Sequence, residues 1–295
     1  MRSELRVSVV IPTFNCGQFI REALVSALEQ TYPVDEVIVV DDGSIDNTKD
    51  VIQEFGERVR YVKQANFGVS AARNAGVANS SGDLVAFLDA DDSWLPEKIE
   101  EQVAIFLADE SVGLVHCGMR EFDSASGTTI AVHLDGAAGY VAERIALWEE
   151  PIVIGPGGSI MVRRSVFENL GGFDPQLKIG EDWEFCFRVA MTSKIGFVPK
   201  VLVNYRNHGG NATKSVGEME RSTLLAWQKV FATDDERIRR LRSRSYGNLH
   251  KVLAGSYLAA GDRIGFVRNL IKSLYYRPAF VWTYARLAAG KRKSI

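Results

Sequence analysis

The chain has 295 residues, of which 46% are hydrophobic and 24% are charged, and its formal net charge at pH 7 is −2. This length suits one sizeable α/β domain with an appendage, and the composition is that of a globular protein rather than a disordered or fibrous one. No uninterrupted apolar run approaches the ~18–20 residues that a membrane-spanning helix needs. We therefore expect no membrane-spanning helix among these residues.

The charge is distributed unevenly along the chain. From Asp235 to Ile295 there are fourteen lysines and arginines against three acids, a balance of +11, whereas the preceding residues have a balance of −13. Such a split indicates two regions with different neighbours. We expect an anionic partner at the basic end.

Two features favour a cytoplasmic location. Residues 1–5 run directly into a strand-like segment and lack the apolar stretch of a signal peptide. The three cysteines (Cys16, Cys117 and Cys186) are odd in number, and their spacing matches no metal-binding pattern. Thiols of this kind fit a reducing compartment best.

The first half of the chain alternates apolar strands with helices. Strands are predicted at residues 7–11, 37–40, 59–63 and 84–88, where short apolar, β-branched runs occur. Helices are predicted between them and after the last, with Asp46 and Ser93 placed as N-terminal caps. Strands separated by helices imply an α/β fold with a largely parallel sheet.

The second half of the chain is less regular. Short strand candidates occur at residues 112–116, 159–162 and 195–198, and residues 155–158 form a turn-rich stretch. Beyond Glu218 the pattern is helical to the end. The sequence therefore predicts a helical C-terminal extension.

Acidic side chains occur where two of the predicted strands end. The second strand ends in Asp41 and Asp42, and the fourth is followed by Asp89, Asp91 and Asp92. Ligands of open α/β sheets bind beyond the carboxyl ends of the strands, so we expect these acids at a binding edge. Clustered carboxylates repel one another unless a cation neutralises them, and their oxygens suit Mg²⁺ or Mn²⁺. The pattern predicts a divalent-metal and phosphate site.

Each of these features alone has a structural explanation. The Asp-Gly-Ser sequence at residues 42–44 is a common turn, Asp91 and Asp92 could cap a helix, and Arg73 could be a solvated surface charge. Their joint placement at successive strand ends favours the functional interpretation.

Five motifs, in order, resemble the signatures of family 2 glycosyltransferases. They lie at residues 9–15 (VVIPTFN), 39–44 (VVDDGS), 68–76 (GVSAARNAG), 87–92 (FLDADD) and 180–183 (GEDW). The resemblance implies a GT-A fold and inverting transfer from a nucleotide-diphosphate sugar. It implies a catalytic domain at residues 1–215, divided near residue 110 into nucleotide-binding and acceptor-binding parts, with the basic helical extension at residues 216–295.

The resemblance also implies roles for individual residues. Those expected to bind the donor nucleotide are Pro12, Thr13, Asn15, Asp42, Arg73 and Asp89. Asp91 matches the ligand of the Mn²⁺ or Mg²⁺ ion, and His208 matches a position where some relatives add a metal or phosphate contact. Asp182 matches the general base, while Glu181 and Trp183 are expected beside the acceptor. The simpler alternatives are a helix cap for Asp182 and a solvated loop histidine for His208.

The C-terminal extension suits an anionic membrane surface. Bulky apolar residues alternate there with bases; the set comprises Ile271, Leu274, Tyr275, Tyr276, Arg277, Phe280, Trp282, Tyr284, Arg286, Lys291, Arg292 and Lys293. A packed appendage with a solvated basic face is the simpler alternative. No nucleic-acid-binding motif accompanies these residues, so a nucleic-acid partner is not expected.

We therefore expect an inverting, metal-dependent glycosyltransferase. Its donor would be a uridine-type nucleotide sugar, and its acceptor a saccharide or lipid-linked saccharide in cell-envelope glycan synthesis, with the protein at the inner face of the membrane. The alternative is a non-catalytic carbohydrate- or nucleotide-binding relative of the same fold. A nicotinamide dehydrogenase is disfavoured, because no Gly-x-Gly-x-x-Gly sequence follows the first strand.

Overall fold

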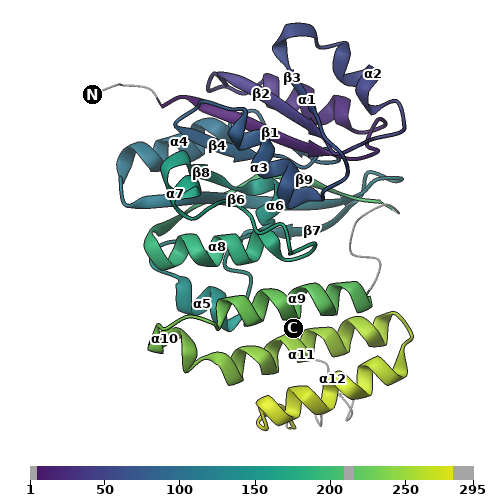
Figure 1. The fold of residues 1–295 in the computed structure, drawn as a ribbon, viewed down its shortest axis with the longest axis vertical. Helices are drawn as coiled ribbons and strands as arrows, with labels where there is room; N and C mark the ends of the chain where they lie inside the picture. Colours follow the sequence, from purple (N-terminus) through teal and green to yellow (C-terminus); the bar gives the residue numbers. More distant parts are fainter. Residues whose placement is uncertain (1–4, 209–215, 282–295) are drawn as a thin grey trace. The chain divides into compact units, whose positions relative to one another are not determined.

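The structure, a computed structural model, describes residues 5–208 and 216–281. The chain forms two compact units, one of Met1–Ala142 with Pro151–Asn211 and one of Glu143–Glu150 with Ala212–Ile295. Figure 1 shows the first unit as a sheet flanked by helices and the second as a group of helices. The helical unit therefore includes the short segment Glu143–Glu150 as well as the C-terminal residues.

The first four strands form a parallel sheet in the order β3-β2-β1-β4. They are β1 (Val7–Thr13), β2 (Glu36–Asp41), β3 (Arg60–Lys63) and β4 (Leu84–Phe87). Every residue of β1 and β4 is buried, as expected of strands covered on both faces. The four strands predicted from the sequence are confirmed.

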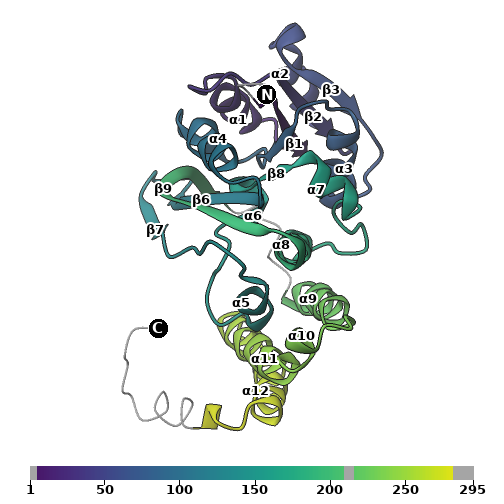
Figure 2. The ribbon, with the colours of Figure 1, turned by 90° about the vertical axis from the view of Figure 1, so that its left-hand side faces the viewer.

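Helices cover both faces of this sheet (Figure 2). They are α1 (Ile20–Leu28), α2 (Thr48–Gln53), α3 (Val69–Ala78) and α4 (Lys98–Ala108), and a 3₁₀ turn follows α2 at Gly56–Arg58. α1 and α4 share a core with β1, while α3 lies on the opposite face against Val40. A Cβ atom on Gly76 of α3 would lie 2.2 Å from Val10 Cγ1, so α3 packs directly on β1.

The two predicted helix caps, Asp46 and Ser93, differ in how well they match the structure. Asp46 Oδ1 accepts a hydrogen bond from Thr48 N at 3.0 Å, although Asn47 occupies the N-cap position of α2. The prediction for Ser93 is wrong, because α4 begins at Lys98 and Ser93 lies in the two-residue strand β5 (Ser93–Trp94). Ser93 pairs there with Asn204, so its backbone is part of a strand and does not begin a helix.

The second half of the sheet mixes strand directions. Its strands are β6 (Val112–Asp123), β7 (Thr129–His133), β8 (Met161–Arg163) and β9 (Lys194–Asn207). β6 and β9 are parallel, β8 joins them to β4 by antiparallel pairing, and β5 and β7 add antiparallel pairs. The three strand candidates of this region are confirmed, although β6 and β9 are much longer than predicted.

Three further helices of this unit surround the sheet: α6 (Pro156–Ser159), α7 (Arg164–Asn169) and α8 (Glu181–Thr192). A cluster of four aromatic rings joins α7 and α8 to β4. Phe173 lies 5.2 Å from Phe87 and 4.6 Å from Phe185, and Phe167 contacts all three, measured between ring centroids. This packing fixes the start of α8 beside the end of β4.

The helical unit consists of α5 (Ala142–Leu147), α9 (Val216–Val230), α10 (Glu236–Arg239), α11 (Arg242–Ala259) and α12 (Arg263–Tyr276). A buried carboxylate, Glu220 on α9, accepts hydrogen bonds from Tyr257 Oη on α11 and from Arg268 on α12. The predicted helical character beyond Glu218 is confirmed over residues 218–281, and the rest of that prediction lies outside the described residues. Within the described parts of the chain, no helix combines the length and the apolar character that crossing a bilayer requires.

Candidate active site

Arg73, on α3, is buried among carboxylates near the end of β4. Its Nη1 donates to Glu181 Oε1 and its Nη2 donates to Asp89 Oδ1, each at 2.7 Å. The arginine side chain is only 3% exposed. Burial alone would lower the pKa of Arg73, but Asp89 and Glu181 raise it overall, so the guanidinium stays charged. Arg73 is therefore no solvated surface charge.

Glu181 and Asp182 begin α8, directly after Gly180, which has φ +83° and occupies the N-cap position. Burial raises the pKa of Glu181 to about 7; Asp182 adds to this shift and Arg73 opposes it. Burial also raises the pKa of Asp182, again against the effect of Arg73. Two neighbouring acids beside one arginine titrate as a coupled pair. A carboxylate with a raised pKa suits a general base near neutral pH.

Glu181 and Asp182 make different contacts. Glu181 is 6% exposed and forms an ion pair with Arg73, so its carboxylate is already held by that arginine. Asp182 Oδ1 accepts a hydrogen bond from Trp183 N at 2.7 Å. Neither acid occupies the N-cap position of the helix, so the capping explanation for Asp182 is not the one that the structure shows.

The two residues expected to bind a metal lie side by side. His208 Nε2 is 2.9 Å from Asp91 Oδ2, although the residues are 117 positions apart. Burial and the charge of Asp89 raise the pKa of Asp91, and His208 opposes this shift. Among residues 5–208 and 216–281 no group of three or more His, Cys, Asp or Glu side chains could hold a metal ion. This part of the chain thus offers a pair of donors rather than a closed cage.

Asp92 links the acidic loop to β9. Its side chain is buried, and Asp92 Oδ1 accepts a hydrogen bond from Arg206 N at 2.9 Å. Arg206 Nε donates to Asp91 O at 2.9 Å, and its Nη2 pairs with Glu22 on α1. Burial, with Asp89 and Asp91 nearby, raises the pKa of Asp92 well above its usual range. Asp92 therefore supports the loop that carries Asp91.

Asp42, expected at the nucleotide base, holds the turn that precedes α3. Asp42 Oδ1 accepts hydrogen bonds from Gln64 Nε2 at 2.7 Å and from Phe67 N at 2.9 Å, and its Oδ2 accepts one from Gly68 N at 2.8 Å. Gly68 has φ +91°, a conformation that favours glycine. The carboxylate thus shapes the loop between β3 and α3.

The end of β1 supplies the other residues expected to bind the nucleotide. Pro12 and Thr13 are buried and lie beside β2. Asn15, with φ +53°, donates its N–H to Ser44 Oγ at 2.9 Å and accepts from Ile45 N through its side chain. Thr13 Oγ1 is buried and forms no hydrogen bond of normal geometry among the described residues, although it lies near the Cys16 thiol. A buried hydroxyl of this kind indicates a position where a ligand group could bind.

Two glycines of α6 lie against the side chains of Arg73, Asp89 and Asp92. A Cβ atom on Gly157 would lie 2.5 Å from Asp89 Oδ2 and 3.1 Å from Arg73 Nη2, and one on Gly158 would lie 3.3 Å from Asp92 Oδ2. A side chain at Gly157 would therefore force Asp89 to shift, and one at Gly158 would make a tight contact with Asp92. The sequence marks this stretch as turn-rich but gives no sign that it lies against the acids.

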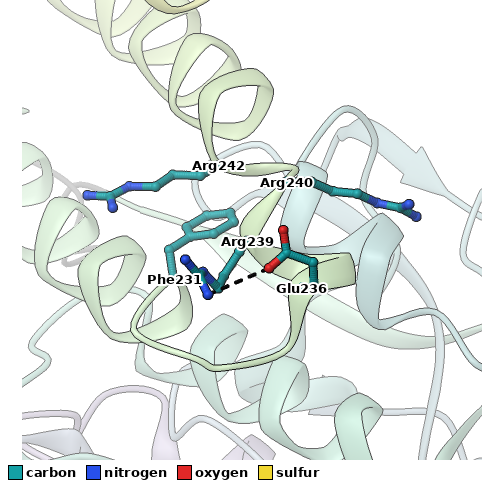
Figure 3. A pocket seen from close by; sticks show the side chains of 5 residues that line it. All are labelled: Phe231, Glu236, Arg239, Arg240 and Arg242. Carbon is teal, nitrogen blue, oxygen red and sulfur yellow. Dashed lines mark ion pairs between the residues drawn. The ribbon is translucent and has the colours of Figure 1, made fainter.

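A cavity of about 250 Å³ lies in the helical unit. Its lining consists of Phe231, Glu236, Arg239, Arg240 and Arg242. Figure 3 shows Arg240 and Arg242 extending in opposite directions, and Arg239 pairs with Glu236 at 3.6 Å. Because the arginines do not converge on one point, this cavity is a poor candidate for an active site.

Comparison with known proteins identifies the family. The family model for "Glycosyl transferase family 2" matches residues 8–171. The chain belongs to glycosyl transferase family 2. It is 32% identical to an uncharacterised glycosyltransferase of Rickettsia prowazekii over 71% of this chain and 66% of the relative. It is 33% identical to one of Nostoc sp. over 70% and 66%, so the match spans just under two thirds of these relatives.

Solved structures confirm the GT-A fold of this family 2 glycosyltransferase. Staphylococcus aureus TarS 1-349 in complex with UDP has a TM-score of 0.68 and 19% identity, covering 93% of this chain and 81% of TarS 1-349. The mannosyltransferase PcManGT of Pyrobaculum calidifontis, in complex with GDP-Man and Mn²⁺, has a TM-score of 0.64 and 22% identity, covering 96% and 84%. At these identities the likeness establishes the fold alone.

Proposed function

We propose that this glycosyltransferase moves a sugar, with inversion, from a UDP-type donor to a saccharide or lipid-linked saccharide in cell-envelope glycan synthesis. The observation that carries the proposal is the position of Arg73, buried between Asp89 at the end of β4 and Glu181 at the start of α8. This ion-pair network connects the residues assigned to the donor with Glu181, which directly precedes Asp182, the residue assigned as base. The similar TarS structures contain UDP or UDP-GlcNAc, which supports the choice of nucleotide.

We assign the nucleoside to the edge formed by Pro12, Thr13, Asn15 and the loop that Asp42 holds. The buried Thr13 hydroxyl supports this assignment. Arg73 is a permanent cation at the same end of the sheet, and a cation beside the diphosphate would oppose its negative charge. Asp89, half-buried and paired with Arg73, would contact the ribose.

Asp91 and His208 fit a divalent metal ion. They offer a carboxylate oxygen and an imidazole nitrogen that already lie 2.9 Å apart. An oxygen-nitrogen pair suits Mn²⁺ better than Mg²⁺, which favours oxygen ligands alone. When bound, the ion would neutralise charge on the departing diphosphate. Two donors from the described residues leave coordination positions for phosphate oxygens.

Asp182 is the residue to which we assign proton removal from the acceptor hydroxyl, with Trp183 beside the acceptor. Inverting transfer requires one base, and the raised pKa of Asp182 improves its ability to take a proton. Glu181 contacts Arg73 directly, so we assign it to holding that arginine rather than to the acceptor.

A panel of nucleotide sugars tests the donor assignment. UDP-, GDP- and dTDP-sugars are added with and without Mn²⁺, and the melting temperature is measured. A ligand that binds only the folded state stabilises that state by about 2.7 kcal/mol when its concentration is 100 times its Kd. We expect the largest, Mn²⁺-dependent rise with a UDP-sugar. A larger rise with the GDP- or dTDP-sugars would contradict the assignment to uridine.

We further propose that the helical unit attaches reversibly to an anionic membrane surface. On α12, an apolar stripe faces solvent, with Ile264 82%, Ile271 62% and Tyr275 80% exposed. Arg263 and Lys272 lie on the same helix. Attachment at the inner face of the membrane would bring the enzyme to lipid-linked acceptors.

Three of the residues expected at the membrane are not available to contact it, because they pack or pair within the helical unit. Tyr276 stacks on His250 with ring centroids 5.7 Å apart, Phe280 is 9% exposed, and Arg277 pairs with Glu149 at 2.7 Å. These three residues stabilise the helical unit internally. Other residues expected at the membrane lie outside the described residues: Trp282, Tyr284, Arg286, Lys291, Arg292 and Lys293.

Vesicle co-sedimentation tests the attachment. We expect full-length protein to sediment with anionic vesicles at low salt, with release at high salt, because attraction is worth ~1 kcal/mol per surface base. Replacing Ile264 and Ile271 together by Gln should weaken binding ~10-fold or more, since each buried aliphatic side chain contributes ~1.5–3 kcal/mol. Val132→Gln, at an exposed position of β7, is the matched control. Failure of the full-length protein to bind anionic vesicles at low salt would refute the attachment.

A further inference from the structure

Lys98, in the first turn of α4, is a fully buried cation with an exposed fraction of 0%. Its Nζ donates to Gln102 Oε1 at 2.9 Å and lies 3.9 Å from the ring centroid of Trp94. No carboxylate pairs with Lys98 in the described part of the chain. Burial lowers the pKa of Lys98 to about 8, and Cys117 opposes the shift. Burying an amine that no acid compensates is costly, so stability alone does not explain Lys98.

Lys98 determines which way the amide of Gln102 points. The amide faces one donor, Lys98 Nζ, and two acceptors, the carbonyl oxygens of Val115 at 3.2 Å and Ser159 at 2.7 Å. An ammonium group can only donate, so Gln102 Oε1 must face it and Nε2 must face the carbonyls. Lys98 therefore fixes the hydrogen bond from Gln102 to Ser159, the last residue of α6.

Trp94 provides a second connection from Lys98 to α6. Trp94 Nε1 donates to Gly158 O at 2.9 Å, and its ring is the one that Lys98 contacts. A cation over an indole ring is attracted to its face, which favours this ring position. The carbonyls of Gly158 and Ser159 are thus both held by side chains that touch Lys98.

The opposite side of α6 lies against the acidic cluster. Gly157 leaves no room for a Cβ atom beside Asp89 and Arg73, and Gly158 has Asp92 close by. Since the backbone of α6 approaches these groups so closely, a small displacement of the turn would change the space beside Asp89. The contacts form a continuous path from Lys98 to the donor site.

We propose that Lys98 is a positioning residue for sugar transfer, acting through Gln102 and Trp94 to hold Gly157 and Gly158 against Arg73 and Asp89. The inference rests on the proposed function, because it assigns Arg73 and Asp89 to the donor. Lys98 itself does not contact the reacting groups. Its effect is on the placement of the sugar and diphosphate, not on affinity for the nucleoside.

Two substitutions test the proposal, one at Lys98 and one at its partner Gln102. Lys98→Met keeps the length and apolar stem of the side chain but removes the donor. Gln102→Glu keeps the shape and gives Lys98 an acidic partner, but it removes the donor to Val115 and Ser159. Glu101→Gln is the control, because Glu101 lies on the same helix and pairs at the surface with Lys200.

The readouts are kcat and KM for turnover of the donor, UDP affinity by calorimetry, and the melting temperature. The donor is the member of the UDP-, GDP- and dTDP-sugar panel that the wild type consumes fastest with Mn²⁺. We expect kcat to fall ~10–10²-fold in Lys98→Met and Gln102→Glu, the range that a displacement of about 1 Å can produce. UDP affinity should match that of the Glu101→Gln control. A purely structural role would lower the melting temperature but leave kcat per folded molecule unchanged.

The results distinguish a failure of this inference from a failure of the proposed function. Wild-type kcat in both variants overturns the inference alone. If Lys98→Met does not fold, Gln102→Glu decides, because it retains the buried pair and gives it opposite charges. No donor turnover by the wild type would contradict the proposed function, and the inference with it.

Discussion

Asp182→Asn is expected to lower the rate of sugar transfer by ~10²–10⁴-fold while donor affinity stays the same. Asparagine keeps the shape of the side chain and the oxygen that accepts from Trp183 N at 2.7 Å, so the start of α8 should be preserved. It cannot accept the proton of the acceptor hydroxyl. The measurement is kcat at saturating donor, together with UDP affinity by calorimetry.

Glu168→Gln is the matched control, since Glu168 lies on α7 with its side chain 60% exposed. Near-normal kcat in Asp182→Asn at saturating substrates would reject Asp182 as the base. The pH profile gives an independent check. The base must be ionised, so the wild-type rate should fall as the pH is lowered through the raised pKa values of the Glu181–Asp182 pair, that of Glu181 being about 7.

Asp91→Ala is expected to remove the Mn²⁺-dependent part of UDP binding, lowering metal affinity at least ~10²-fold, because even groups that only support a ligand contribute ~10–100-fold. The neighbouring acids cannot replace it: Asp89 is paired with Arg73, and Asp92 is buried and bonded to Arg206 N. His208 alone would leave the ion without an anionic ligand. Calorimetry of UDP binding with and without Mn²⁺ measures the loss.

Asp50→Ala provides the control for this substitution, because Asp50 is an exposed acid on α2. It should leave the Mn²⁺ dependence intact. If Asp91→Ala binds UDP with the same Mn²⁺ dependence as the wild type, then Asp91 is not the metal ligand.

Much of the first unit could be predicted because its central strands β1 and β4 are buried on both faces. β1 and β4 are unbroken apolar runs, a local signal that remains visible without any knowledge of the fold. The parallel order then places their carboxyl ends together. Asp42, Asp89 and Asp91 are detectable for the same reason, since each lies one to three residues after a predicted strand.

The remaining features depend on partners far along the chain. Ser93 resembles a helix cap locally, but its pairing with Asn204 puts it in a strand. The contact of Arg206 with Glu22 joins residues 184 positions apart. Lys98 resembles a solvated lysine of an amphipathic helix, but in the fold it lies over the ring of Trp94 and donates to Gln102, which bonds to carbonyls of β6 and α6. No periodicity in the sequence reports such contacts.

We expect an active enzyme, and repeated turnover of a donor is the most direct test of this expectation. Full-length protein is incubated with Mn²⁺ and the nucleotide sugar that stabilises it most, and release of free nucleoside diphosphate is followed over time. We expect many molecules of UDP per molecule of protein, with loss of turnover when the metal is chelated. A protein that is stabilised by the donor but never consumes it would contradict this account and identify the chain as a non-catalytic nucleotide-sugar-binding relative.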